Sequence, residues 1–184
     1  MTYEMDIAGL KRDLPICKVT DDLYIGAFVM FGDVELTVHC ASELLKLAPE
    51  YDYIIAPEAK AIPLLYEMAR QSGAERYFVA RKKEKAYMQG VFKVDVNSIT
   101  TEGTQTLVID AEDAAQLRGR RVLIIDDVIS TGESLHAMEI LVNEVGGTVV
   151  GKMAVLAEGD AADRDDIITL NKLPLFNADG TVKE

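Results

Sequence analysis

The stretch Val122-Leu-Ile-Ile-Asp-Asp-Val-Ile-Ser-Thr-Gly-Glu-Ser134 decides how the rest of the sequence is interpreted. It begins with four apolar residues, three of them β-branched, which predict a strand buried on both faces. Two adjacent carboxylates, Asp126 and Asp127, follow where we expect that strand to end. Apolar residues with helical spacing from Leu135 onward predict a helix. The hydroxyl- and glycine-rich segment between the acids and this helix is therefore a loop that opens a helix.

This order of elements has the chemistry needed to hold a phosphorylated sugar. A loop at a helix N-terminus offers unpaired backbone N–H groups and a positive dipole end to a phosphate. Gly132 allows close approach, and the hydroxyls of Thr131 and Ser134 can donate to the same oxygens. Carboxylates do not bind phosphate, so Asp126 and Asp127 must serve vicinal sugar hydroxyls or a bound Mg²⁺. A ribose 5-phosphate carries both a phosphate for the loop and vicinal hydroxyls for the two acids.

Three other interpretations fit parts of the stretch. A receiver domain also has paired acids after a strand, but near its beginning, whereas this pair lies past the midpoint. A Walker B strand needs a phosphate loop elsewhere, and the nearest match, Gly146-Gly-Thr-Val-Val-Gly-Lys-Met153, lacks the final Ser or Thr and runs into a predicted strand. The third alternative is a solvated strand end followed by a simple helix cap at Ser130 and Thr131.

The stretch resembles the 5-phosphoribosyl 1-diphosphate (PRPP) binding motif of type I phosphoribosyltransferases. That motif has four hydrophobic residues, two acids, two variable residues, a small residue, Thr-Gly and a hydroxyl residue, and here Glu133 stands where many members have glycine. The resemblance implies that Asp126 and Asp127 are the catalytic pair at the ribose hydroxyls, with any contact to Mg²⁺ made indirectly through PRPP or water. It also implies that the 5′-phosphate is bound by the loop residues Ser130, Thr131, Gly132, Glu133 and Ser134.

Composition narrows the class of protein. The chain has 184 residues, 49% hydrophobic and 27% charged, which suits one soluble domain with a substantial core. Its net charge of −12 argues against nucleic acid or an anionic membrane as a partner. The first residues do not form a signal peptide, and no apolar run reaches transmembrane length. Cys17 and Cys40 show no metal-ligand spacing, so we expect reduced, partly buried thiols in a cytoplasmic protein.

Around the motif, strands alternate with helices, which predicts an α/β fold with a mainly parallel sheet flanked by helices. Ligands of such sheets gather at the carboxyl ends of the strands. The expected elements are a helix over Asp33–Ala48, a strand over Tyr53–Ala56, a helix over Leu64–Ser72, a strand over Arg76–Ala80, and strands over Thr148–Leu156 and Ile167–Leu170 on the far side of the motif.

Cations follow two of the predicted strands, and in an acidic chain this suits a diphosphate better than a solvated face, although a charged loop is the alternative. Glu58-Ala-Lys-Ala61 is similar to the Glu-Ala-Arg-Gly diphosphate loop of adenine phosphoribosyltransferases, with Lys for Arg and Ala for Gly. Arg81-Lys-Lys-Glu-Lys85 is similar to a segment of purine enzymes in which a lysine contacts the diphosphate. The implied diphosphate ligands are Ala59, Lys60, Arg81, Lys82 and Lys85.

The resemblance also assigns the remaining segments of a single domain spanning residues 1–184. Residues from about 1 to 32 and from about 158 to 184 would form a small hood over the base, with Phe28 and Phe176 as candidate contacts to it. Alternating residues over 91–96 and 104–109 predict a β-ribbon within a flexible loop of about residues 84–110. That loop would close over PRPP and exclude water. Members of the family are commonly homodimers.

Together these features predict a purine phosphoribosyltransferase that transfers the 5-phosphoribosyl group of PRPP–Mg²⁺ to a purine base and releases diphosphate, as in purine salvage. Ser130 stands where hypoxanthine-guanine enzymes of the mammalian type carry an aspartate, which argues against that subgroup. Glu58-Ala-Lys60, Arg81-Lys-Lys83 and the chain length resemble adenine phosphoribosyltransferases, which favours adenine as the acceptor, giving AMP. A xanthine or hypoxanthine/guanine enzyme is an alternative. A non-catalytic PRPP-sensing regulator of the same fold is another, weakened by the acidic charge and by the lack of a helix-turn-helix pattern before residue 50.

Overall fold

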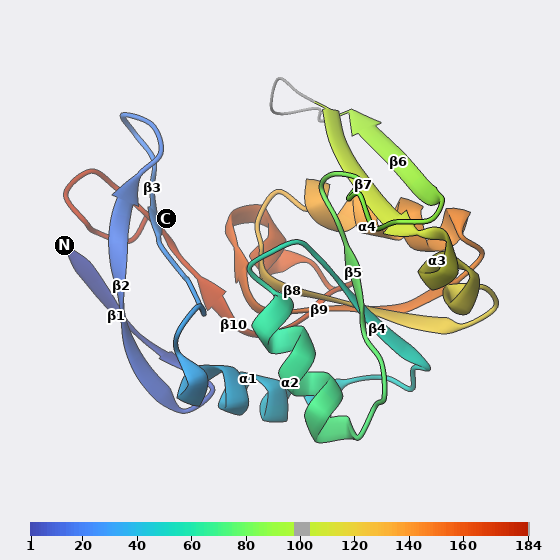
Figure 1. Cartoon of the computed structure of the whole chain (residues 1–184). Coiled ribbons are helices and arrows are strands. Elements are labelled where there is room, and N and C mark those ends of the chain that lie inside the picture. The colour runs from blue at the N-terminus through green and yellow to red at the C-terminus, as the bar shows by residue number, and fades with distance from the viewer. Residues whose placement is uncertain (98–103, 184) are drawn as a thin grey trace.

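In the computed structural model, which describes residues 1–97 and 104–183, a five-stranded parallel sheet carries the predicted motif at its centre (Figure 1). Its strand order is β10-β9-β8-β4-β5. All four pairings are parallel, as the strand–helix alternation predicted. The strands are β4 (Tyr53–Pro57), β5 (Phe78–Ala80), β8 (Arg121–Ile129), β9 (Thr148–Glu158) and β10 (Ile168–Leu173).

Helices cover both faces of this sheet, which explains why residues 122–125 of the central strand are all apolar. Leu123 and Ile125 of β8 pack into a core shared with α1 (Val34–Leu47) and α2 (Ile62–Ser72). Val122 and Ile124 point to the other face, into a core shared with α3 (Ala111–Leu117) and α4 (Glu133–Glu144). Successive side chains of a strand alternate between faces, so a segment covered on both sides is expected to be apolar at every position.

A second, antiparallel sheet forms the hood and joins the two ends of the chain. It contains β1 (Thr2–Ile7), β2 (Leu10–Lys18), β3 (Tyr24–Gly26) and β11 (Leu175–Phe176), in the order β1-β2-β3-β11. Figure 1 shows it standing beside the central sheet. A separate ribbon pairs β6 (Val91–Asn97) with β7 (Thr104–Asp110), as the alternation of those residues predicted, while the predicted turn over 98–103 lies outside the described residues.

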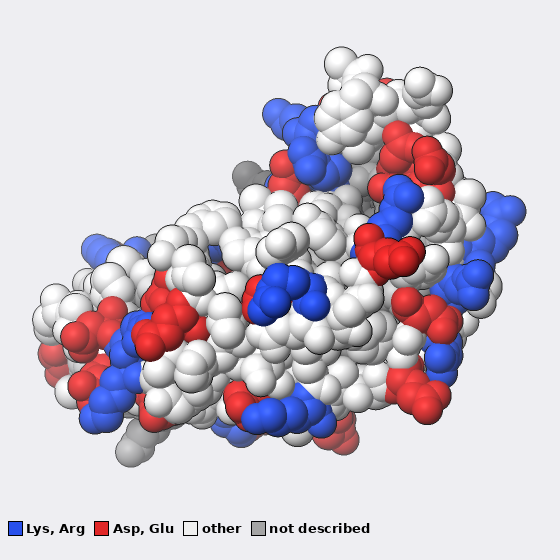
Figure 2. All heavy atoms as spheres, turned by 60° about the horizontal axis from the view of Figure 1, so that its bottom comes forward, with Lys and Arg blue, Asp and Glu red and all other residues white. Residues whose placement is uncertain are grey.

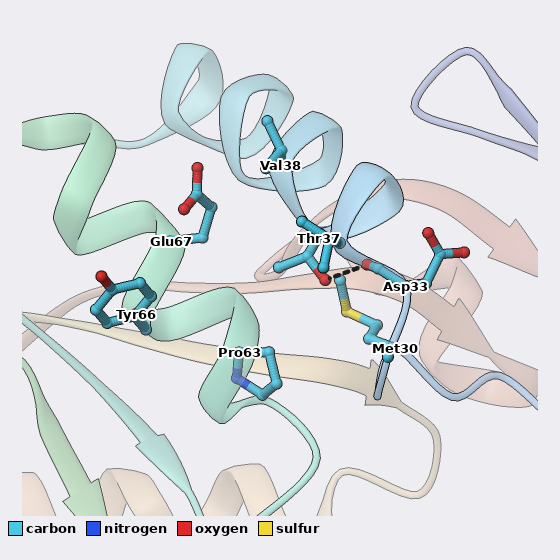
Figure 3. Close-up of a pocket in the computed structure, with 9 residues that line it drawn as sticks. Met30, Asp33, Thr37, Val38, Pro63, Tyr66 and Glu67 are labelled. Carbon is cyan, nitrogen blue, oxygen red and sulfur yellow. Dashed lines mark hydrogen bonds between the residues drawn. The ribbon is translucent and has the colours of Figure 1, made fainter.

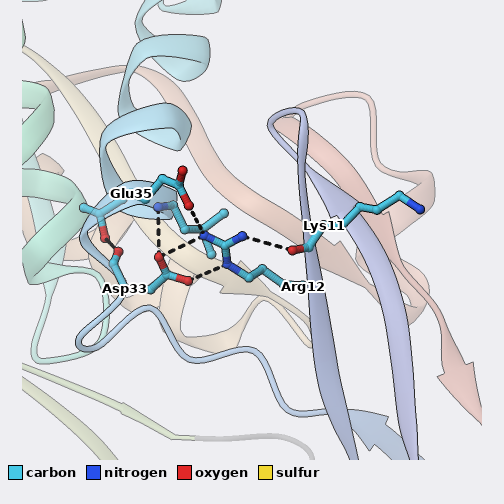
Figure 4. Close-up of polar contacts among 6 residues, drawn as sticks. Lys11, Arg12, Asp33 and Glu35 are labelled. Carbon is cyan, nitrogen blue, oxygen red and sulfur yellow. Dashed lines mark hydrogen bonds and ion pairs between the residues drawn. The ribbon is translucent and has the colours of Figure 1, made fainter.

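Arg12 fastens the hood to the first helix of the core (Figure 4). Its Nε lies 2.6 Å from Oδ2 of Asp33 and its Nη2 lies 2.8 Å from Oε2 of Glu35. Asp33 is the predicted N-cap of α1 and also accepts a hydrogen bond from the Leu36 N–H at 3.0 Å. The guanidinium lowers the pKa of the Asp33 carboxyl, so one ionised side chain both caps the helix and binds β2.

Several element boundaries differ from the prediction. β8 continues to Ile129, past both acids, because its ladder with β9 extends through Asp126↔Ala154 to Ile129↔Ala157. α4 begins at Glu133, two residues before Leu135, where the apolar pattern predicted the helix to begin. The acidic segment after β9 contains a 3₁₀ turn, η1 (Gly159–Asp163). Cys40 is buried as a free thiol, whereas Cys17, also free, is exposed.

Candidate active site

The acid pair lies near the carboxyl end of the central strand and is almost completely buried. Asp126 is 9% exposed and Asp127 3% exposed. The Asp127 N–H donates to Oδ1 of Asp126 at 2.9 Å. Burial and the neighbouring charge of Asp127 raise the pKa of Asp126 well above its ordinary range. The fold therefore buries two adjacent carboxyl groups, and ionising both of them at once costs free energy.

Lys60 joins this acid pair to the loop between β4 and α2. Its Nζ lies 2.7 Å from Oδ2 of Asp127, and about half of the Lys60 side chain is exposed. Among the described residues this Oδ2 has no partner with hydrogen-bond geometry, so the contact with Lys60 is an ion pair. The same loop contains Ala59, which follows a cis peptide bond from Glu58. Two of the predicted diphosphate ligands thus lie on a loop that reaches the predicted ribose site.

Arg81, Lys82 and Lys85 gather around one carboxylate on that loop. Oε2 of Glu58 accepts a hydrogen bond from the Lys82 N–H at 3.0 Å and lies 3.6 Å from Nε of Arg81. Nζ of Lys85 lies 3.8 Å from Oε1 of Glu58. The hydrogen bond from Lys82, reinforced by these cations, lowers the pKa of Glu58. The structure therefore places Arg81, Lys82 and Lys85 against the loop that carries Lys60, as expected for neighbouring parallel strands.

The predicted phosphate loop forms the entry to α4. Gly132 is the N-cap, with φ +78°, a left-handed conformation that favours glycine, and no side chain caps the first turn. Thr131 Oγ1 lies 3.5 Å from the Glu133 nitrogen, too far for a strong cap. The interpretation of this loop as a simple Ser/Thr cap is thus not supported, because the N-cap residue is a glycine and no side-chain cap of α4 is found among the described residues.

Arg164 also lies against this loop, although no motif in the sequence marks it. A Cβ built on Gly132 would lie 2.6 Å from Nη1 of Arg164. Asp166 orients the guanidinium through two hydrogen bonds, from Nε at 2.8 Å and from Nη2 at 2.7 Å. The arginine sits in the acidic segment after η1, where a charge run gives no sign of a binding role. Its packing gives Gly132 a second reason to lack a side chain.

A cavity of about 310 Å³ adjoins the acid pair and the phosphate loop beneath the hood. Lys60 and Ser130 line it together with Phe28, the first of the two predicted base contacts. Phe176, the second, is fully buried and packs edge-to-face on Tyr3 with ring centroids 5.1 Å apart. It is not a lining residue. The complete lining is Ile25, Gly26, Ala27, Phe28, Val29, Lys60, Val128, Ser130, Glu158 and Leu173.

A second cavity, of about 240 Å³, lies between α1 and α2 (Figure 3). Met30, Pro63 and Tyr66 line it, and the Thr37 hydroxyl there donates to the Asp33 carbonyl at 2.7 Å. Glu67 of α2, one of its two acidic lining residues, is already paired with Arg70 at 2.7 Å. None of the predicted site residues lines this cavity, so the cavity under the hood is the better candidate site.

The surface charge and the helix lengths were compared with what a nucleic-acid or membrane protein would need. On the face shown in Figure 2, basic and acidic side chains are interspersed rather than gathered into one positive surface. In the described part of the chain, no helix is long and apolar enough to cross a membrane.

Comparison with known proteins identifies the family. The family model for the phosphoribosyl transferase domain matches residues 39–179. The adenine phosphoribosyltransferase of Thermotoga maritima is 37% identical over 158 residues, which cover 85% of this chain and 87% of that protein. The one from Rhodococcus jostii is 35% identical over 147 residues, 79% of this chain and 78% of that protein. This chain belongs to the phosphoribosyltransferase family, as the motif at residues 122–134 predicted.

A solved structure agrees with this assignment. The crystal structure of adenine phosphoribosyltransferase from Thermoanaerobacter pseudethanolicus has a TM-score of 0.66 at 26% identity, covering 94% of this chain and 95% of that one. The predicted α/β fold with a mainly parallel sheet and a hood from both chain ends is confirmed.

Proposed function

We propose that this protein transfers the 5-phosphoribosyl group of PRPP to a purine base, with adenine as the acceptor, and releases diphosphate. The observation that carries the proposal is the buried pair Asp126–Asp127, held next to Lys60 and beside the cavity under the hood. The named relatives support adenine in particular, since those at 35–37% identity are adenine phosphoribosyltransferases.

Each part of the site has a role in this reaction. The loop over 130–134 anchors the 5′-phosphate and so fixes the position of C1 of the ribose. Asp126 and Asp127 accept hydrogen bonds from the ribose hydroxyls and favour the positive charge that develops on the ring. As the bond from C1 to the diphosphate oxygen breaks, its electron pair leaves with the diphosphate, while a ring nitrogen of the base forms the new bond to C1 and the base releases its N–H proton to solvent. The leaving diphosphate is stabilised by backbone and cations of the two strand-end loops, from Ala59, Lys60, Arg81, Lys82 and Lys85.

Mg²⁺ enters this proposal as part of the substrate complex. Among the described residues, no group of three or more His, Cys, Asp or Glu side chains is placed to hold a metal ion. Mg²⁺ prefers six oxygen ligands and is often bound by one or two carboxylates together with substrate phosphates and water. Asp126 and Asp127 fit that pattern, with contacts made through PRPP or water. When bound, the ion would neutralise charge on the diphosphate.

We further propose that the protein is a cytoplasmic homodimer. PRPP is a charged phosphorylated sugar that does not cross membranes, so an enzyme using it works where it is made. Phe31, Val34 and Tyr66 are each more than half exposed, and the last two line the cavity between α1 and α2. Exposed apolar groups of this kind are typical of interfaces. Light scattering after size exclusion should give twice the mass of the chain, and a monomeric mass at micromolar concentration would contradict the dimer.

The function is tested by measuring diphosphate release from PRPP and Mg²⁺ with adenine, hypoxanthine, guanine and xanthine in separate reactions. We expect release with adenine to be fastest. Faster release with another purine would keep the transferase and replace its acceptor. No release with any purine, together with thermal stabilisation by PRPP, would instead support the regulator alternative.

A further inference from the structure

Glu158 is the acidic residue that lines the cavity under the hood. It ends β9, where its pairing with Leu173 of β10 fixes the backbone, and both residues line the cavity. Apart from Ser130 and Lys60, the other lining residues are apolar. The ammonium group of Lys60 is already 2.7 Å from Asp127. Glu158 is thus a charged group in an otherwise largely apolar cavity, facing space that a ligand can fill.

The Glu158 carboxylate has no hydrogen-bond or ion-pair partner anywhere in residues 1–97 and 104–183. Its side chain is partly buried, and this burial raises its pKa although the charge of Lys60 acts in the opposite direction. A buried carboxylate without a partner is costly and is normally satisfied by a donor. Glu58 accepts a hydrogen bond from the Lys82 N–H, whereas Glu158, which lines the cavity, has its acceptor capacity open among the described residues.

The purine bases differ in what they offer such a group. Adenine carries an amino group at C6, which donates to a carboxylate. Hypoxanthine, xanthine and guanine carry an oxygen at the same position, which a carboxylate repels. A neutral carboxyl group suits adenine equally well, because it accepts from the amino group and donates to a neighbouring ring nitrogen. An ionised carboxylate at this wall therefore favours a 6-amino over a 6-oxo purine, whereas a neutral carboxyl group, which can also donate to a 6-oxo group and accept from the ring N–H beside it, would discriminate little.

We infer that Glu158 is a specificity-determining residue that accepts a hydrogen bond from the 6-amino group of the acceptor base and excludes 6-oxo purines. This inference rests on the proposed function, since it assigns the base end of the same site. Glu158 lies outside the PRPP motif and outside the loops after β4 and β5 that carry the predicted diphosphate ligands. The choice of base would thus depend on one side chain at the end of β9.

The test compares kcat/KM for adenine and for hypoxanthine in the wild-type protein, Glu158→Gln and Glu158→Ala. A glutamine amide accepts from a 6-amino group or donates to a 6-oxo group by rotating, so Glu158→Gln should lower the adenine-to-hypoxanthine ratio. The expected change is about tenfold to a hundredfold, the usual effect of one hydrogen bond to a charged group. Glu158→Ala should lower the ratio through loss of adenine use. Glu144→Gln, a change at an exposed position of α4, is the matched control and should leave the ratio unchanged.

The KM for PRPP separates a role in base choice from damage to the fold. It should stay within about twofold of wild type in both Glu158 variants, because the phosphate loop and the cations are untouched. If the wild type uses adenine and both variants keep the wild-type ratio, the assignment of Glu158 is wrong while the proposed function stands. If the wild type releases diphosphate with no purine, the proposed function and this inference fail together.

Discussion

The two charged parts of the site are constructed in opposite ways. The acids lie within the ladder of the central strand, and Asp126 and Asp127 are both nearly inaccessible to solvent. The cations lie on an irregular loop after β5, where Arg81 and Lys85 keep about a third of their side chains exposed. Charges inside a sheet are fixed in place and costly to ionise, whereas charges on a loop are screened by water and cost little. The ribose part of the site is therefore rigid, and the diphosphate part is adjustable.

The largest effect should come from the rigid part. Asp126→Asn and Asp127→Asn preserve size and shape but replace a carboxyl oxygen at the ribose site with an amide nitrogen, which cannot accept from the ribose hydroxyls. We expect each to lower kcat/KM for diphosphate release by about 100- to 1,000-fold, the range found when a preorganised electrostatic contact is removed. Steady-state kinetics with adenine would measure this, and unchanged far-UV circular dichroism would show that the fold survives.

A control for these variants is Asp165→Asn, at an exposed position of the acidic segment after η1. It removes the same charge from the protein without touching the acid pair. If Asp126→Asn retained full activity, or if Asp165→Asn were equally damaging, the placement of the ribose at the central strand would be wrong.

The adjustable part should respond less to single changes. Arg81→Gln and Lys85→Gln are each expected to raise the KM for PRPP by about two- to fivefold, because partly exposed ion pairs contribute about 1 kcal/mol or less. Added salt should raise the KM of the wild type and have a smaller effect on the variants, since it screens the same charges.

Lys83 offers a matched control for this comparison, because it is exposed on the same loop and is not one of the predicted ligands. Lys83→Gln should change the KM for PRPP by less than about twofold. An effect as large as that of Arg81→Gln would mean that the loop acts through its total charge rather than through particular side chains.

What the sequence predicts well here is local. Residues 122–134 carry the acids and the phosphate loop in one continuous segment, and Asp33 marks the start of α1 by its position before an apolar repeat. Such features depend on neighbours in the chain, so pattern and spacing are enough to find them.

The residues that were missed or misplaced depend on tertiary contacts. Glu158 and Arg164 reach the site because β9 and η1 end beside it, and nothing in the acidic segment around them signals this. Phe176 packs on Tyr3 instead of lining the cavity, because β11 pairs with β3 in the hood sheet. The end of β8 was placed too early since the length of its partner, β9, sets how far the ladder runs.

The smallest predicted effect is on the free energy of unfolding, and it tests whether the buried acids, unlike the exposed cations, reduce the stability of the fold. The pKa of Asp126 is raised in the folded protein by burial and by Asp127, while in the unfolded chain it takes its ordinary value. Between these two pKa values the folded state holds a proton that the unfolded state has lost. The free energy of unfolding should therefore fall as pH rises from the ordinary aspartate range through the raised pKa.

Asp126→Asn removes this titration, so without PRPP the variant should be more stable than wild type by about 1 kcal/mol or more at pH 8, with a smaller difference at pH 5. Urea unfolding at both pH values would measure it, and shifts of all other groups cancel in the difference between the two proteins. A pH-independent difference, or a less stable variant at pH 8, would contradict the cost assigned to the buried pair. A variant that is more stable yet inactive would instead indicate that the fold keeps Asp126 for its ligand at the expense of its own stability.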